Sequence, residues 1–315
     1  MKNKNVVVIG GGTGTYTVLS GLKHYPLNLA AVVSMADDGG STKTLREEFG
    51  ILPPGSVRPA IIALSEAEKP LADLFTFRFS EGSLRDHNFG NLFITALTQQ
   101  LGSFERALDE ISKILKLKGR VIPSTLQDIR LHAQLENGEI VKGETNIDVP
   151  KHNGVRRIKK VWLDPAYNAN PRAVDAIRRS DLIVIGPGDL FSSVVPNFLP
   201  TGIAQAVRES KGKKAYVSNL TTKFGETTGF GAHDFVSIVE TYLGEGVLDY
   251  VVVNSRKPGK ERILKYAKAK SEIVAYNKEL LQGKGLRVVE ADLMRKQGFI
   301  RHDPDQLARL LFSLL

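Results

Sequence analysis

Six short apolar segments restrict this chain of 315 residues to a small set of architectures. Each is rich in valine or isoleucine, and none alternates apolar with polar residues, which is typical of strands buried on both faces of a parallel sheet. Segments with helical apolar spacing lie between them. Strand and helix in alternation predict an α/β fold: a Rossmann-like, doubly wound, mostly parallel sheet with helices on both faces. The predicted strands are Asn5–Gly10, Ala30–Met35, Leu182–Gly186, Ala215–Asn219, Tyr250–Asn254 and Arg287–Ala291, and the predicted helices include Tyr16–Leu22, Ala173–Arg179, Ile203–Ser210 and Phe235–Leu243.

The middle of the chain interrupts this alternation. Residues from about 59 to 117 have the apolar spacing of consecutive helices. An insertion over about 126–163 has the pattern of a β-hairpin with one further strand, and Asn137-Gly138 predicts a type I′ turn between its two alternating runs. The final segment, 303–315, starts with an Asp-Pro-Asp cap, so we expect a helix packed on the sheet. We interpret residues 1–315 as a single nucleotide-binding domain.

Composition narrows the class of protein. Cysteine is absent, which excludes disulfides, thiolate catalysis and cysteine metal sites. No apolar run approaches the roughly 18 residues of a membrane helix. The apolar run near the N-terminus is short and stops at a glycine cluster, unlike a signal peptide. We therefore expect a cytoplasmic protein without membrane insertion.

The formal net charge of +9 favours anionic partners such as phosphorylated metabolites. Basic residues cluster in "KILKLKGR", "RRIKK" and "RKPGKERILKYAKAK". These clusters lack the interleaved aromatic residues of single-strand binders, and no helix-turn-helix or zinc-finger spacing is present. Solvated helix faces and loops explain them more simply, so we expect no nucleic-acid partner.

The first predicted strand ends in a glycine-rich loop: Gly10, Gly11, Gly12, Thr13 and Gly14. The carboxyl ends of parallel strands meet at one edge of a sheet, and ligands bind there where the strand order reverses. Glycines bring backbone N–H groups close to an anion, and the following helix adds its N-terminal dipole. We expect a phosphate or diphosphate here. The third glycine of the dinucleotide fingerprint is missing, so a tight turn without a ligand is the alternative.

The second predicted strand ends at two adjacent aspartates, Asp37 and Asp38. One acidic residue at this place commonly holds a ribose hydroxyl. Two adjacent carboxylates predict that one holds a sugar hydroxyl while the other positions a hydroxyl or Mg²⁺. Alternatively, one aspartate caps the next helix and the other faces solvent. The residues expected to take a phosphate at that helix start are Gly39, Gly40, Ser41 and Thr42.

Three later stretches complete the predicted site. A histidine and an asparagine four residues apart would share one face of a helix that points into the crevice. Alternatively, the histidine caps that helix. A zinc site is not expected, because no second histidine or cysteine lies nearby in the sequence. The third predicted strand ends in a glycine turn, and the fourth ends in uncharged hydrogen-bonding residues. We expect both to contact the ligand; the alternative is that they only form ordinary turns. The residues are His87 and Asn91; Gly186, Pro187 and Gly188; and Asn219 and Thr221.

Taken together, these motifs resemble the CofD/YvcK family. "IGGGTGTYTVLSGLK" resembles its opening loop and helix, and "DDGGSTKTLR" resembles its second loop. "LPPGSVR", "DHNFGNLFITAL", "IGPGDLFSSVVPNFL" and "SNLTTKFGETTGF" resemble its later segments, in the same order along nearly the whole chain.

The resemblance implies one of two functions. YvcK-type proteins are gluconeogenesis factors linked to cell shape and without a settled reaction, and membership of this branch implies a regulatory protein that binds a UDP-sugar or NAD. The other branch transfers a phospholactyl group from a guanosine diphosphate donor, which would make this a Mg²⁺-dependent transferase with Asp38 orienting the acceptor. "LPPGSVR" and "FGNLFITAL" favour the first branch. A nucleic-acid-binding or scaffold protein is the third alternative, and a homo-oligomer is compatible with each.

Four residues depart from the family pattern. Ser56 replaces an acidic residue, Lys43 and Asp86 replace glycines, and Asp189 replaces a serine. Lys43 could contact a phosphate, whereas Asp189 would repel one unless it binds a hydroxyl or a metal. These changes concern the identity of the ligand more than the fold.

Overall fold

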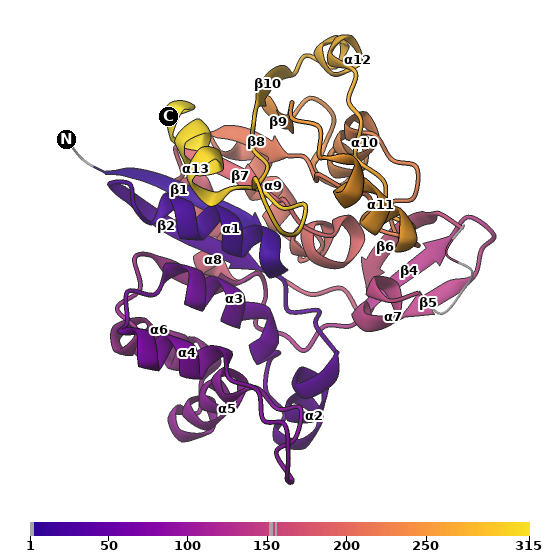
Figure 1. Cartoon of the computed structure of the whole chain (residues 1–315). Coiled ribbons are helices and arrows are strands. Elements are labelled where there is room, and N and C mark those ends of the chain that lie inside the picture. Colours follow the sequence, from indigo (N-terminus) through magenta and orange to yellow (C-terminus); the bar gives the residue numbers. More distant parts are fainter. Residues whose placement is uncertain (1–2, 151–153, 155) are drawn as a thin grey trace.

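Parallel strands form the centre of the computed structural model, which describes residues 3–150, 154 and 156–315 (Figure 1). The sheet has seven strands, and every neighbouring pair in it is parallel. All six predicted strands are confirmed, and the unpredicted edge strand β3 completes the sheet. The strand order is β10 (Arg287–Ala291), β9 (Tyr250–Asn254), β8 (Lys213–Val217), β7 (Leu182–Ile185), β1 (Lys4–Gly10), β2 (Leu27–Val33) and β3 (Arg120–Pro123).

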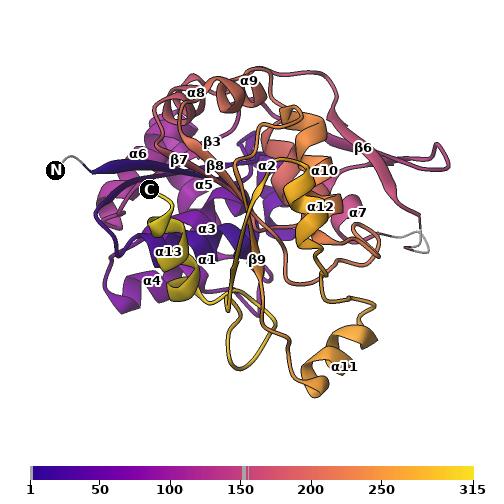
Figure 2. The same cartoon turned by 90° about the horizontal axis from the view of Figure 1, so that it is seen from above.

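The strand order reverses between β1 and β7. From β1 the chain proceeds through β2 and β3 to one edge, and from β7 it proceeds to β10 at the other. Helices therefore cover both faces (Figure 2), with α1, α3 and α13 on one side and α8 and α9 on the other. The predicted doubly wound α/β fold is confirmed. The bounds are α1 (Gly12–Leu22), α3 (Pro54–Leu64), α8 (Pro171–Arg178), α9 (Ile203–Glu209), α10 (Ala232–Leu243) and α12 (Lys278–Gly283).

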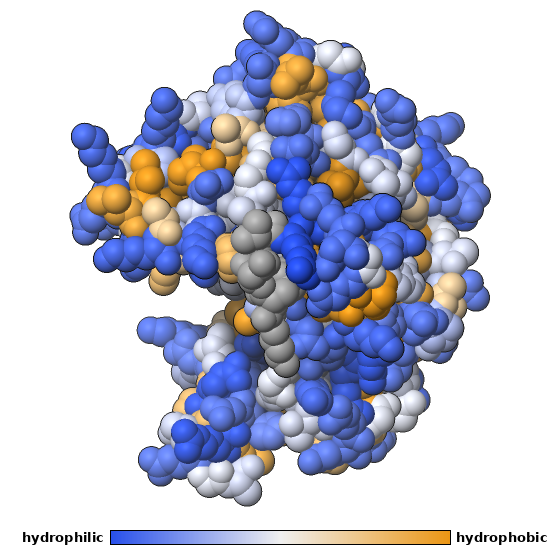
Figure 3. Space-filling model, turned by 90° about the vertical axis from the view of Figure 1, so that its right-hand side faces the viewer, coloured by the Kyte–Doolittle hydropathy of each residue, from blue (hydrophilic) through white to orange (hydrophobic). Residues whose placement is uncertain are grey.

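Consecutive helices fill the segment between β2 and β3, as its apolar spacing predicts. They are α2 (Gly40–Phe49), α3, α4 (Lys69–Thr76), α5 (Phe89–Leu101) and α6 (Phe104–Ile114). Residues 77–88 between α4 and α5 are not helical, and Arg78 pairs there with Asn88 in an antiparallel bridge. In the space-filling view of Figure 3, a hollow separates the lower part of the molecule from the rest.

The predicted hairpin forms a separate antiparallel sheet in the order β5 (Ile140–Lys142), β4 (Leu131–Leu135), β6 (Ile158–Leu163), and the short helix α7 (Glu144–Asp148) follows β5. The predicted type I′ turn is wrong. Gly138 has a φ of +87°, but Asn137 is not among the residues with positive φ. The N–H of Gly138 donates to the carbonyl of Leu135, and the N–H of Leu135 donates to that of Glu139. These bonds define a three-residue loop in which only the last residue needs the left-handed conformation.

The C-terminal helix α13 (Pro304–Ser313) begins at the predicted cap, since the Asp303 carboxylate accepts the N–H groups of Asp305 and Gln306. Its direct neighbour is α1: a Cβ on Gly21 would lie 2.2 Å from the carbonyl oxygen of Pro304. The helix therefore packs beside α1 on one face of the sheet. No helix in the described part of the chain is long and apolar enough to cross a membrane.

Candidate functional site

The glycine turns that follow β1 and β7 meet where the strand order reverses. They follow β1 and β7, which are neighbours in the sheet. Gly12 has a φ of +61°, which favours glycine at the start of α1. A Cβ on Gly14 would lie 1.9 Å from the carbonyl oxygen of Pro187, so only glycine lets α1 approach this turn. The N-terminus of α1 is thereby held against the turn that follows β7.

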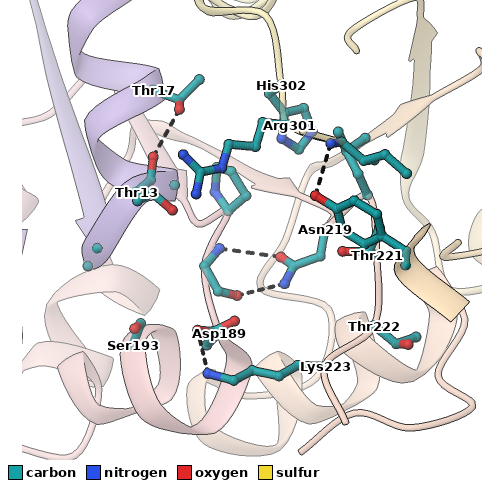
Figure 4. A pocket seen from close by; sticks show the side chains of 18 residues that line it. Thr13, Thr17, Asp189, Ser193, Asn219, Thr221, Thr222, Lys223, Arg301 and His302 are labelled. Carbon is teal, nitrogen blue, oxygen red and sulfur yellow. Dashed lines mark hydrogen bonds and ion pairs between the residues drawn. The ribbon is translucent and has the colours of Figure 1, made fainter. Parts of the chain in front are cut away.

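A cavity of about 300 Å³ lies beside these turns (Figure 4). Its walls come from the carboxyl ends of β1, β7 and β8, from the helix α11 (Lys260–Lys268) and from the loop that precedes α13. Backbone groups and uncharged side chains supply much of the surface. The lining residues include Gly11, Gly12, Thr13, Gly14, Thr17, Pro187, Gly188, Ser193, Asn219, Thr221 and Tyr266.

Asn219 holds the turn after β7 in place. Its Nδ2 atom donates to the carbonyl of Gly188 at 2.8 Å, and its Oδ1 atom accepts the N–H of the same glycine at 3.3 Å (Figure 4). Asn219 lines the cavity as predicted, but its amide is largely engaged by the protein. It therefore positions the turn that a ligand would contact.

One lysine pairs with two aspartates on one side of the cavity. Lys223 Nζ pairs with Asp189 Oδ2 at 2.8 Å and also with Asp148. Burial by itself lowers the pKa of Lys223, but the carboxylates of Asp189, Glu226 and Asp148 outweigh it and raise the pKa above its ordinary value. The predicted repulsion between Asp189 and a phosphate is thus reduced by the partly buried ammonium group of Lys223.

Arg301 and His302 reach the same cavity from the loop before α13, far along the chain from the glycine turns. In Figure 4 Arg301 extends into the cavity from the side opposite Ser193. Its guanidinium makes no ion pair among the described residues and lies 5.2 Å from the Phe299 ring. Burial lowers the pKa of His302 to about 4, so its ring is neutral at pH 7, and its Nε2 has no partner in the described part of the chain. Among the described residues that line this cavity, Arg301 is therefore the cation without an ion pair.

A second cavity of about 140 Å³ adjoins the first, and Gly11, Gly12 and Ser193 line both. Asp37 and Glu144 place two carboxyl groups in it. Burial raises the pKa of Asp37, against hydrogen bonds from Gly39 and Thr42. Burial, with repulsion from Asp37, Asp148 and Asp38, raises the pKa of Glu144 to about 9. Glu144 is therefore protonated at pH 7, and the second cavity combines a hydrogen-bond donor with an acceptor.

Asp38 lines neither of these cavities. Its two carboxylate oxygens accept the backbone N–H groups of Glu144 at 3.1 Å and Thr145 at 2.9 Å. Asp38 therefore caps α7, not the helix α2 that follows it in sequence. With Gly39, Gly40 and Lys43, it borders a separate cavity of about 350 Å³.

Six other predicted residues line neither of the two adjoining cavities: Gly10, Ser41, Thr42, His87, Asn91 and Gly186. His87 precedes α5 and bonds Ser41, with 3.1 Å between Nδ1 and Oγ. Asn91 is buried, and its Oδ1 accepts from Arg58 Nε at 3.0 Å. The predicted shared helical face is wrong, because α5 begins at Phe89 with Asn88 as its cap. These residues, with Thr42, support the loop that carries Asp37, while Gly10 and Gly186 are buried at the ends of their strands.

Residues 6–294 match the family described as 2-phospho-L-lactate transferase CofD. The chain belongs to this family. A Nostoc sp. relative is 42% identical over 99% of this chain and 69% of that protein. A Bacillus subtilis protein named gluconeogenesis factor is 40% identical over 98% of each chain.

A solved structure supports the same membership. The crystal structure of a UPF0052 family protein from Bacillus halodurans is similar to this chain with a TM-score of 0.94 and 39% identity, over 99% of each chain. The recognised resemblance and the predicted fold are therefore confirmed for this CofD-family chain.

Sequence reasoning missed several lining residues of this CofD-family site. Glu144 lies in the predicted hairpin insertion, and Tyr266, Arg301 and His302 lie near the C-terminus, outside any predicted strand end. The basic segment that contains Tyr266 is predicted from the sequence to be a solvated helix face, not part of a binding site. No local pattern distinguishes these residues, because long-range packing brings them to the cavities.

Proposed function

We propose that this chain binds a nucleotide diphosphate, either a UDP-sugar or NAD, as a cytoplasmic regulatory protein of the gluconeogenesis-factor type. The supporting observation is the meeting of the α1 N-terminus, the turn after β7 and the unpaired Arg301 around one cavity. Backbone N–H groups at a helix N-terminus and a guanidinium are well suited to a diphosphate. The name of the B. subtilis relative supports the regulatory assignment.

The two adjoining cavities suggest how such a ligand would lie. The glycine loop is shared, since Gly11 and Gly12 line both cavities. A diphosphate on this loop would leave the nucleoside in the larger cavity and the sugar in the smaller one, where Asp37 accepts a hydroxyl. Asp37 takes this task in place of Asp38, whose carboxylate is held by α7.

Calorimetry with UDP-glucose, UDP-N-acetylglucosamine and NAD tests the proposal. Arg301→Gln removes the unpaired cation and should weaken binding roughly ten- to a hundredfold. Arg309→Gln, on the exposed face of α13, is the matched control and should bind like the wild type. Absence of heat with every nucleotide diphosphate, from a folded wild-type protein, would reject the proposal.

A group-transfer reaction is the second candidate, supported by the CofD family description and by the two carboxyl groups in the smaller cavity. Glu144 would hold a proton, and Asp37 would orient an acceptor hydroxyl. No group of three or more His, Asp or Glu among the described residues is arranged to hold a metal, so Mg²⁺ would be shared between Asp37 and the donor diphosphate. Incubation with a deazaflavin and a guanosine diphosphate donor tests this by mass spectrometry, and an unchanged acceptor mass would exclude it.

A further inference from the structure

The helix α11 projects from the body of the molecule (Figure 2), and none of its residues is buried. Its inner side is held by two residues. Arg262 donates to the carbonyls of Arg295 at 3.0 Å and Phe299 at 2.8 Å, and the Tyr266 hydroxyl accepts the N–H of Ile300 at 2.9 Å. Since these bonds orient the helix, the opposite side faces away from the protein.

The outer side of α11 carries an apolar side chain between positive charges. Leu264 is 64% exposed, and Lys260 and Lys268 stand one turn before and after it. Phe299 is 58% exposed beside the helix, with Lys265 Nζ 5.2 Å from its ring. In Figure 3 hydrophobic residues ringed by hydrophilic ones appear on the projection at the left.

Most of the positive charge of this surface has no ion-pair partner among the described residues, although Arg256 pairs with Asp292 at 3.4 Å. Residues 256–270 contain seven Lys or Arg and one acidic residue, Glu261. Within the described ranges, Lys260, Lys265 and Lys268 make no ion pair. Positive potential and exposed apolar side chains therefore coincide on one convex surface, which we call the α11 patch: Lys260, Leu264, Lys265, Lys268 and Phe299.

We propose that the α11 patch binds the surface of an anionic lipid bilayer. Leu264 and Phe299 would enter the boundary between headgroups and acyl chains, while the lysines reach the anionic headgroups along their aliphatic stems. Nucleic acid is disfavoured because Phe299 is the single aromatic ring among the five patch residues, and bases or phosphates would leave the exposed Leu264 without an apolar partner. The helix lies on the bilayer and does not span it.

The α11 patch is separable from the nucleotide site. Tyr266 lines the 300 Å³ cavity, and Ile263 lines another of about 460 Å³ beneath α11. The five patch residues line neither. Substitutions at Lys260, Leu264 and Lys268 should therefore change lipid binding and leave both nucleotide binding and the unfolding temperature unchanged.

Co-sedimentation of the full chain with vesicles tests the proposal. Vesicles of phosphatidylcholine alone are compared with vesicles that also contain phosphatidylglycerol, at rising salt. Lys260→Gln with Lys268→Gln should weaken binding roughly 25-fold, at about fivefold for each lysine. Leu264→Ser should weaken it roughly tenfold. The controls carry the same chemical changes elsewhere: Lys159→Gln with Lys211→Gln, and Leu280→Ser at an exposed position of α12.

We expect binding only to the vesicles with phosphatidylglycerol, loss of binding at high salt and no effect of the control substitutions. Equal binding to both vesicle types, no binding to either, or equal losses in patch and control variants would overturn the proposal. Salt-sensitive binding of an RNA or DNA oligonucleotide without vesicle binding would assign the patch to nucleic acid instead.

Discussion

Neighbouring aspartates in this chain have different environments, although nothing in their immediate sequence separates them. Asp37 lines the smaller cavity beside Glu144, whereas both oxygens of Asp38 are occupied by the N-terminus of α7. The alternative that one aspartate caps a helix is partly right, but the capped helix is α7 in the hairpin insertion. Proximity to Asp37 and burial together explain why Glu144 holds its proton.

The raised pKa of Glu144 predicts a pH-dependent stability. The folded chain binds this proton up to a pKa of about 9, and the unfolded chain loses it near 4.5. The free energy of unfolding should therefore fall as pH rises through this range, by at most about 1.4 kcal/mol per pH unit from this group. Glu144→Gln should lack this contribution, and urea unfolding of both proteins across the range measures the difference.

Glu279→Gln is the control, because Glu279 is exposed in the first turn of α12. It should follow the wild-type pH dependence. Below the unfolded pKa, wild type and Glu144→Gln should be equally stable. Parallel curves for both across the whole range would show that Glu144 is ionised in the folded chain.

Gly14→Ala should separate α1 from the turn after β7. The added methyl group would lie 1.9 Å from the Pro187 carbonyl oxygen, so one of the two segments must move. We expect a loss of about 1–3 kcal/mol in unfolding free energy together with weaker nucleotide binding. Gly283→Ala in α12, where the methyl group meets nothing within 4 Å, should leave both unchanged. Full binding by Gly14→Ala would contradict the tight approach of the two turns.

At the scale of elements, α7 joins the hairpin insertion to the second loop through Asp38. Asp38→Ala removes both acceptors and should lower the unfolding free energy by about 2 kcal/mol, and Asp38→Asn should lose less because one acceptor remains. Urea unfolding measures both, with Asp73→Ala on exposed α4 as the control. An unchanged stability with loss of group transfer would return Asp38 to a catalytic assignment.

Most elements were predictable because their patterns are local. The six predicted strands lack alternation, and the hairpin strands alternate around Asn137-Gly138. Five of the six are largely buried, whereas β10 lies at the sheet edge and has no buried residue. The edge strand β3 is not predicted from the sequence, because Arg120–Pro123 is short and ends in proline. The type I′ prediction failed because the same dipeptide also suits a three-residue loop, and the pairing of Leu135 with Glu139 selects that loop.

At the scale of the whole molecule, the larger cavity joins segments from both ends of the chain. Thr13 follows the first strand, and Arg301 follows the last. A saturating UDP-sugar or NAD should therefore slow hydrogen exchange at residues 11–14, 186–189 and 299–302 together. Ligand at 100 times its Kd should also add about 2.7 kcal/mol to the unfolding free energy.

The hairpin strands at 131–142 should keep their exchange rates and serve as the internal control. Protection of only one of the three segments would show that the cavity walls do not act on a common ligand. Arg301→Gln should lose the protection at all three segments in parallel, because the diphosphate contact is shared.

The amino-acid sequence by itself determined the class of fold and the edge of the sheet at which the site lies. Buried parallel strands have a local signature, and their carboxyl ends must share one edge, so Gly11, Gly188 and Asn219 converge as a consequence of connectivity. Only the tertiary structure decided that Asp37 faces the cavity while Asp38 holds α7, and that Arg301 completes the wall. These choices depend on packing between residues distant in sequence, and no local pattern of residues encodes such packing.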